Sequence, residues 1–118
     1  MSGTLEIKEV ESILETFFAG LDTRDAGTIR EIWHPDAKLF LHNATLNARP
    51  LSFLLGLPDL MEFQVKEIRW VNIHGAIATA RVDYSMSVGN HSGYFHLAKA
   101  GGQWRIANWV DHGLASQN

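Results

Sequence analysis

The strongest constraint on the fold is a change in hydrophobic period along the chain. Residues 5–22 repeat apolar side chains at the spacing of one helix face. The residues on this face are Ile7, Val10, Leu14, Phe17, Phe18 and Leu21. From residue 65 onward the period is two, which predicts strands over residues 65–74, 76–88, 92–99 and 103–112. A helix followed by strands with tight turns favours an α+β domain, with helices covering one face of an antiparallel sheet.

Between the first helix and the sheet we expect a short second helix and a less regular stretch. Asp25 is a suitable N-cap for this helix, whose apolar residues share one face. Pro35 disfavours helical geometry at His34, so the helix should end there and a strand should follow over residues 38–42. Residues 43–63 are rich in Leu and interrupted by Pro and Gly. We expect one or two short helices in that stretch, forming a flap over an apolar interior.

Length, charge and composition narrow the classes of function. The 118 residues suit one domain that spans residues 1–118. A net charge of -3 offers no basic surface for nucleic acid, and the longest apolar run is too short to cross a membrane. The chain contains no cysteine, which excludes disulfides and thiolate chemistry. The N-terminal residues lack the pattern of a secretion signal, so we expect a cytoplasmic protein without nucleic-acid or membrane partners.

A two-residue turn at Gly101 and Gly102 predicts the register of the last hairpin, because both positions tolerate the positive φ of such turns. This register places Leu97 opposite Ile106 and directs one face of the sheet toward the helices. That inward face is predicted to carry Tyr84, Met86, Phe95, Asn108 and His112. The outer face is predicted to pack on a second copy of the chain, since aromatic and arginine side chains are enriched at interfaces. The outer face is predicted to carry Tyr94, His96, Arg105 and Trp109, together with Asp83 and Asp111. A one-residue bulge would reverse the assignment of either acid.

Three segments carry a resemblance to a known family. They are the aromatic-His-Pro-Asp-Ala segment at 33–37, the Gly-x-Trp-x-Ile-x-Asn strand at 102–108, and His112 near the end. With these parts the chain resembles the NTF2-like superfamily, the cystatin-like cone fold of ketosteroid isomerase, scytalone dehydratase and the SnoaL-like polyketide cyclases. It looks most like the small bacterial proteins grouped as putative lumazine-binding. The resemblance implies a homodimer formed through the outer sheet face and a pocket between sheet and helices.

The predicted pocket combines apolar walls with a few convergent polar groups, the usual composition of a small-molecule site. The apolar candidates are Phe17, Trp33, Phe53, Phe95 and Met86. The polar candidates are His34, Tyr84, Asn108 and His112. His34 has two readings, as a general base for a ligand or as a cap of its helix. The leading hypothesis is a homodimer that binds an apolar or aromatic small molecule, with no cofactor.

Two other functions stay open. The first is an enzyme of the isomerase, dehydratase or cyclase kind, with His34 or His112 transferring a proton. Superfamily enzymes typically use an acid or an Asp–His pair, and the predicted inward face contains no acid. The second is a dimeric interaction module without a ligand, which predicts an exposed apolar patch around residues 54–60. The six histidines show no metal-binding spacing, so we expect no metal site.

Overall fold

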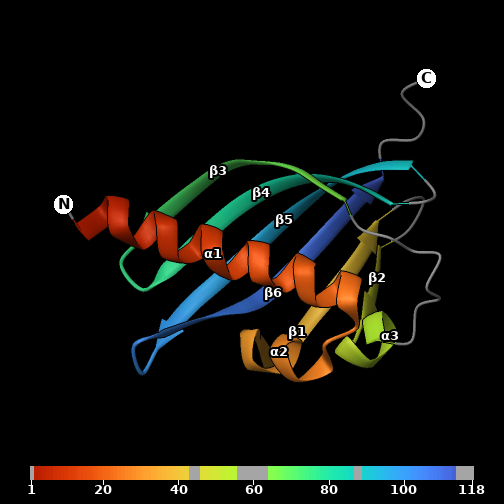
Figure 1. Cartoon of the computed structure of the whole chain (residues 1–118), viewed down its shortest axis with the longest axis horizontal. Helices are drawn as coiled ribbons and strands as arrows, with labels where there is room; N and C mark the ends of the chain where they lie inside the picture. The colour runs from red at the N-terminus through yellow and green to blue at the C-terminus, as the bar shows by residue number, and fades with distance from the viewer. Residues whose placement is uncertain (1, 43–45, 56–63, 87–88, 114–118) are drawn as a thin grey trace.

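A computed structural model of the chain describes residues 2–42, 46–55, 64–86 and 89–113. Helices α1 (Ser2–Thr23) and α2 (Ala26–Ile32) lie on one face of a curved six-stranded sheet (Figure 1). The strands are β1 (Trp33–His42), β2 (Leu46–Arg49), β3 (Gln64–His74), β4 (Ile77–Met86), β5 (Gly89–Ala100) and β6 (Gln103–Gly113). A third, short helix, α3, spans Leu51–Leu55. The predicted α+β fold, with N-terminal helices packed on a curved sheet, is therefore confirmed.

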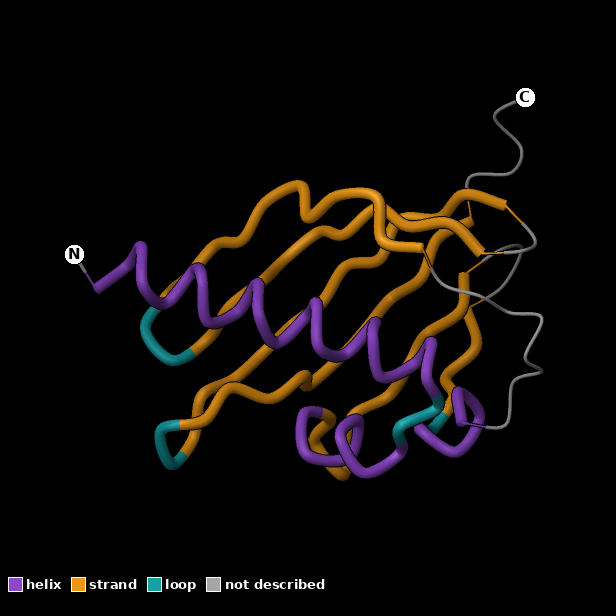
Figure 2. The backbone as a smooth tube through the Cα atoms, viewed as in Figure 1, coloured by secondary structure: helices purple, strands orange, loops and turns teal. Residues whose placement is uncertain are grey.

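The strand order is β2-β1-β6-β5-β4-β3. Strands β3 to β6 form an antiparallel meander, and short turns connect β3 to β4 and β5 to β6 (Figure 2). Gly101 and Gly102 have φ angles of 60° and 79°, as the expected two-residue turn requires. Strand β1 joins the other edge of β6 in parallel, and β2 pairs with β1. The sequence pattern did not predict this parallel pair, because it brings together segments far apart in the chain.

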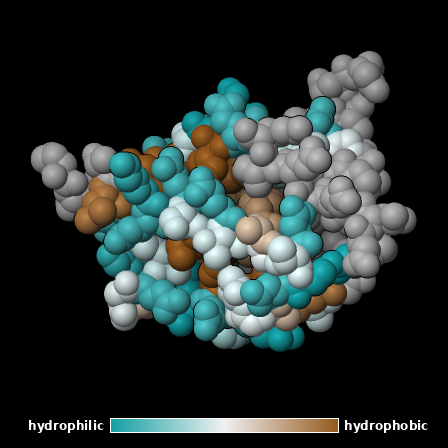
Figure 3. All heavy atoms as spheres, viewed as in Figure 1, coloured by the Kyte–Doolittle hydropathy of each residue, from teal (hydrophilic) through white to brown (hydrophobic). Residues whose placement is uncertain are grey.

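Helix α1 crosses the sheet diagonally and buries its predicted apolar face (Figure 1). The opposite side of the helix is solvated, and the surface on this side of the molecule is largely hydrophilic (Figure 3). Arg24 adopts a left-handed conformation with φ of 60°, which ends the helix. The carboxylate of Asp25 then caps α2 by accepting a hydrogen bond from the Thr28 N–H at 3.2 Å. No helix among the described residues is long and apolar enough to span a membrane.

The boundaries of the second helix and of the next strand differ from the prediction. Helix α2 ends at Ile32 and not at His34, and β1 begins at Trp33 rather than at residue 38. Pairing of Trp33 with Ile106 in β6 extends this strand toward the helix. In the stretch expected to hold short helices, α3 is present and Leu46–Arg49 form β2. The second expected helix, near residue 58, lies outside the described residues.

A β-bulge in the last hairpin changes which side chains face the helices. Leu97 pairs with Ile106, as predicted, but the next pair is His96 with Asn108, so Ala107 has no partner. One unpaired residue turns every later side chain to the other face. Trp109 and Asp111 therefore point inward, and the predicted outward placement of both is wrong.

Because of the same bulge, the predicted inward placement of two further residues is wrong. Asn108 and His112 lie on the outer face of β6, half-buried and exposed respectively, and not on the inward face. Asn108 has its side-chain nitrogen 3.5 Å from His96 Nδ1, also on the outer face. Asp83 lies on the outer face, where Ser92 donates to its carboxylate at 2.8 Å.

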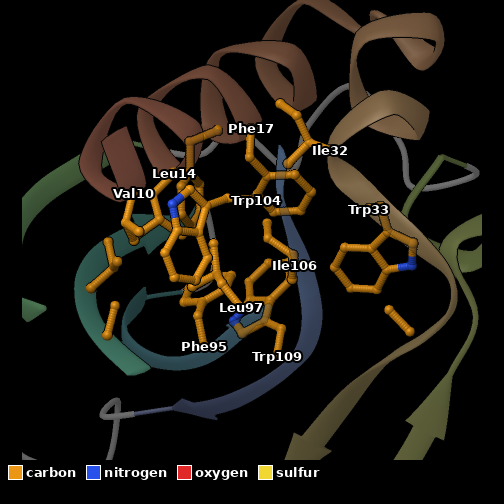
Figure 4. Close-up of a cluster of buried hydrophobic side chains, with 14 of the residues drawn as sticks. Val10, Leu14, Phe17, Ile32, Trp33, Phe95, Leu97, Trp104, Ile106 and Trp109 are labelled. Atoms are coloured by element: carbon orange, nitrogen blue, oxygen red, sulfur yellow. The ribbon is translucent and has the colours of Figure 1, made fainter. Parts of the chain in front are cut away.

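Aromatic rings fill the interior between α1 and the sheet (Figure 4). Phe17 stacks on Trp33 with ring centroids 5.6 Å apart, and Phe95 stacks on Trp109 at 5.0 Å. Phe17 meets Trp109 edge to face at 5.6 Å, which links the two stacks. All four rings are buried, so this part of the interior is packed protein rather than open cavity.

Candidate functional site

Three polar side chains from the last three strands meet at the end of the interior that lies away from the Gly101-Gly102 turn. They are Tyr84 of β4, His91 of β5 and Asp111 of β6. The strand register brings them together, because Tyr84 pairs with His91 and Asp111 pairs with Gly93, two residues beyond His91. All three point toward the helix side of the sheet. We call this group the polar cluster.

Hydrogen bonds connect the members of the polar cluster through Asp111. The hydroxyl of Tyr84 donates a short hydrogen bond to Oδ1 of Asp111. Nδ1 of His91 lies 3.1 Å from each of the two carboxylate oxygens. The rings of Tyr84 and His91 are stacked, with centroids 5.8 Å apart and an angle of 6° between the planes. A carboxylate that orients an imidazole in this way is the arrangement found in general-base sites.

Burial keeps Tyr84 protonated. The residue is 1% exposed, and Asp111 is 8% exposed. Burial, then the charge of Asp111 and then the hydrogen bond to it raise the pKa of Tyr84 well above its usual value of 10.0. Tyr84 is therefore a neutral hydrogen-bond donor over the physiological pH range. The side chains of His91 and Asp111 keep 13% and 11% exposure, so a narrow part of the cluster is accessible.

The indole of Trp109 contacts the polar cluster from the side of the core. Nε1 of Trp109 donates to the hydroxyl oxygen of Tyr84 at 3.2 Å. Phe18 of α1 packs on both rings, with centroids 5.1 Å from Tyr84 and 5.8 Å from Trp109. The hydrogen bonds of the cluster are thus enclosed by aromatic surface, where electrostatic interactions are stronger than in water.

Gly93 provides the space in which these rings meet. A Cβ atom at this position would lie 2.6 Å from Trp109 Nε1 and 2.8 Å from Tyr84 Cε1. Both distances are shorter than any that real Cβ atoms adopt, so the rings would have to move. Glycine in the interior of a strand often marks such a close approach.

The structure places the predicted site residues in three groups. Phe17, Trp33, Tyr84 and Phe95 are buried inside, and of these Tyr84 belongs to the polar cluster. Asn108 and His112 lie on the outer face, as described above, so they cannot act with the cluster. The side chains of Phe53 and Met86 lie outside the described residues.

His34 is exposed and stands apart from the cluster, at the start of β1. Its Nδ1 accepts a hydrogen bond from the backbone N–H of Asp36 at 3.0 Å. This local bond lies in the irregular part of β1 between Trp33 and Lys38. The geometry resembles neither the predicted ligand contact nor the predicted helix cap.

Sequence reasoning missed His91 and Asp111. The signal for His91 was present, because position 91 lies on the same face of β5 as the buried positions 93, 95 and 97, but the strand was predicted to start at residue 92. Strand β5 begins at Gly89. Asp111 was placed on the outer face because no local signal marks the bulge at Ala107.

The described residues contain no group of three or more His, Cys, Asp or Glu side chains that could hold a metal ion. His91 and Asp111 supply two potential ligands, one fewer than a catalytic zinc site uses. A separate groove of about 440 Å³ lies between α1 and the β5–β6 turn, and it includes no member of the polar cluster. It is lined by Leu5, Lys8, Glu9, Ser12, Ile13, Gly102, Gln103 and Trp104.

Comparisons with known proteins agree with the fold. Residues 5–110 match the model of a family described as putative lumazine-binding. No curated protein matches the chain. Among solved structures, an NTF2-like protein of unknown function from Shewanella baltica OS155 is 22% identical, with a TM-score of 0.79. That similarity covers 92% of this chain and 94% of the other.

Two further solved structures represent the range of similar proteins. An NTF2-like protein with a cystatin-like fold from Novosphingobium aromaticivorans is 16% identical with a TM-score of 0.75, covering 94% of this chain and 84% of the other. The hexachlorocyclohexane dehydrochlorinase LinA-type3 from Novosphingobium barchaimii LL02 is 13% identical with a TM-score of 0.74, covering 94% and 88%. At these identities the likeness shows the shared fold alone.

Proposed function

Since the chain belongs to the putative lumazine-binding family of NTF2-like proteins, we propose that it binds a small, uncharged, largely apolar or aromatic molecule at the polar cluster and transfers a proton to or from it. His91 is the base, Asp111 orients it and stabilises its protonated form, and Tyr84 donates a hydrogen bond. The observation that carries this proposal is the hydrogen-bonded Tyr84–Asp111–His91 arrangement inside an aromatic interior.

The chemistry of the walls supports an uncharged ligand. Among the described residues, Ser92 and Asp111 are the buried polar side chains, and Ser92 belongs to the outer-face network. An anionic ligand would be repelled by the carboxylate of Asp111 and would find no buried Lys or Arg among the described residues. The rings of Phe18 and Trp109 border the polar cluster, and such apolar surroundings suit an uncharged molecule better than a charged one.

The inward position of Asp111 favours proton transfer over simple binding. An imidazole hydrogen-bonded to a carboxylate is the pairing that general bases use, because the carboxylate orients the ring and stabilises the imidazolium that forms. One of the similar solved structures is described as a hexachlorocyclohexane dehydrochlorinase. Removal of a proton from carbon is chemistry that a base in such an interior can perform, and we extend only this reaction type to the present chain.

Binding is tested with a thermal-shift screen of uncharged aromatic and alicyclic compounds, with lumazine and riboflavin included. We expect a saturable stabilisation, about 2.7 kcal/mol at a ligand concentration of 100 Kd. The shift should persist in His96→Gln, a matched control at an exposed outer-face histidine. It should weaken in Asp111→Asn. The absence of any saturable shift in the folded wild-type protein would refute the ligand proposal.

Proton transfer is tested on the ligands that bind. Each is incubated with the protein in D2O, and NMR records deuterium incorporation at its acidic C–H positions. We expect incorporation with the wild type and with His96→Gln, and at least a tenfold loss with His91→Gln, since general-base catalysis contributes about 10²–10⁴-fold. Equal rates for both histidine variants would refute the role of His91 as the base.

We also propose that two copies associate through the outer sheet face. Trp70 and Tyr94 are 39% and 40% exposed there, with ring centroids 6.1 Å apart, and Arg81 lies over the Tyr94 ring at 5.9 Å. His96 follows Tyr94 on the same face of β5, Arg105 donates to the backbone carbonyl of Glu31 at 3.3 Å, and Trp109 is removed from the predicted interface because it is buried inside. Exposed aromatic and arginine side chains in one patch are typical of an interface.

Sedimentation velocity tests this association. A dimer that dissociates in Trp70→Glu is the expected result, and a wild-type monomer at high micromolar concentration would refute it. The alternative of an interaction module without a ligand depends on a patch around residues 54–60, most of which lies outside the described residues.

A further inference from the structure

Trp109 differs from the other buried tryptophans that the structure describes. Trp33, Trp104 and Trp109 are each no more than 3% exposed. The indole N–H groups of Trp33 and Trp104 have no hydrogen-bond partner. The N–H of Trp109 instead donates to the hydroxyl oxygen of Tyr84 at 3.2 Å. An unpaired buried N–H is costly, and of these three indoles Trp109 is the one whose N–H is hydrogen-bonded, to a member of the polar cluster.

The indole nitrogen is a donor only, and this fixes the direction of the bond. The hydroxyl oxygen of Tyr84 must accept from Trp109. The single hydroxyl hydrogen of Tyr84 is then directed to Oδ1 of Asp111, its partner in the short hydrogen bond. Without the indole, that hydrogen is no longer confined to Oδ1 of Asp111 and can turn toward the vacated position.

The direction of these hydrogen bonds also decides which ring nitrogen of His91 carries the hydrogen. With Tyr84 donating to Oδ1, this oxygen of Asp111 acts as a hydrogen-bond acceptor. Nδ1 of His91 lies 3.1 Å from both carboxylate oxygens, so it must carry the hydrogen in the neutral ring. Nε2 is then left with its lone pair. The hydrogen on one ring nitrogen is commonly set by the partner of that nitrogen in this way.

We propose that Trp109 is a positioning residue, which fixes the hydrogen bonds in the order Trp109, Tyr84, Asp111, His91 and so holds His91 with Nε2 free as the proton acceptor. Gly93 is the residue that permits this, because any Cβ there would lie 2.6 Å from the indole nitrogen. The functional role of this hydrogen-bond order rests on the proposed proton transfer. Its geometry is measurable in the free protein, without ligand or turnover.

The test is the tautomer of neutral His91, read from long-range ¹H–¹⁵N NMR spectra of ¹⁵N-labelled protein. In the wild type we expect at least a tenfold excess of the Nδ1–H form, which corresponds to about 1.4 kcal/mol. In Trp109→Phe, which keeps an aromatic ring against Phe95 but removes the N–H, the Nε2–H form should become readily detectable. Trp104→Phe and Trp33→Phe are matched controls, since they remove equally buried indoles that make no hydrogen bond, and both should keep the wild-type pattern.

Two results would overturn the inference. The first is a wild-type protein in which neutral His91 is mainly the Nε2–H form. The second is a Trp109→Phe protein that keeps the tenfold excess of Nδ1–H. If Trp109→Phe does not fold, Gly93→Ala supplies a second comparison, because the added methyl would clash with both the Trp109 indole nitrogen and the Tyr84 ring and so must disturb their contact. A correct tautomer with no ligand deuteration would refute the proposed proton transfer and leave the hydrogen-bond order standing.

Discussion

Replacing Tyr84 by Phe gives a prediction that is specific in both size and pH dependence. The change removes one hydroxyl that donates to Asp111 and accepts from Trp109, and it leaves the ring in place. Hydrogen bonds to charged groups contribute about 1.5–3 kcal/mol, and a neutral bond contributes about 1 kcal/mol. We therefore expect the free energy of unfolding at pH 8 to fall by about 2–4 kcal/mol.

The pH dependence follows from the raised pKa of Tyr84 in the folded protein. Above pH 10.0 the tyrosine ionises in the unfolded chain but stays protonated in the folded one, so the folded state binds more protons and stability falls as pH rises. At one pH unit above this value the wild type should have lost about 1.4 kcal/mol from this group. The Tyr84→Phe variant has no hydroxyl at this position and cannot lose this contribution to stability. The gap between the two proteins should narrow by that amount between pH 8 and pH 11.

Urea denaturation at pH 8, 10 and 11 measures the gap directly. The chain has only two tyrosines, and Tyr94 is 40% exposed on the outer face, so Tyr94→Phe is a matched control. We expect that control to change stability by less than about 1 kcal/mol. A Tyr84→Phe protein within about 0.5 kcal/mol of wild type at pH 8, or a gap that stays constant up to pH 11, would refute the described environment of the hydroxyl.

Three further predictions concern the fold around the site. Phe95→Ala should reduce the free energy of unfolding by about 3–5 kcal/mol in chemical denaturation, because its buried ring stacks on Trp109; a loss below about 1 kcal/mol would contradict that packing. Asp25→Ala should lower the melting temperature at neutral pH. Hydrogen bonds from the side chain and then the backbone of Thr28 lower the pKa of Asp25 below 3.8. The difference in melting temperature should therefore disappear as the wild-type carboxylate protonates in acid. A difference that persists in acid would oppose the capping role. Deleting Ala107, the unpaired residue, should leave Trp109 opposite Phe95 and Asp111 opposite Gly93 and so preserve cooperative unfolding by circular dichroism; loss of that cooperativity would contradict the described register.

The sequence predicts those parts of the molecule that depend on neighbours along the chain. The spacing of Val10, Leu14 and Phe17 predicts the buried face of α1, and all three are fully buried. Two glycines at 101 and 102 predict the last turn, because only residues tolerant of positive φ suit it. The family resemblance, carried by short motifs at 33–37 and 102–108, is confirmed by the family match. Each of these signals is local.

The site could be predicted only in part. Tyr84 follows from period-two alternation in β4, and the same alternation includes His91 once β5 is extended to Gly89. Asp111 does not follow from the sequence. The face on which the Asp111 side chain lies depends on whether Ala107 is paired, and an alanine between Ile106 and Asn108 carries no mark of a bulge.

By itself, the sequence determined the class of fold, the faces of α1 and the turn that starts the last hairpin. The tertiary structure alone decided that β1 pairs in parallel with β6, and that Asp111 rather than Asn108 meets Tyr84 and His91. The physical reason is that the side chains of a strand alternate with a period of two. One unpaired residue therefore moves every later side chain of the strand to the opposite face. This change decides which polar groups lie in the interior.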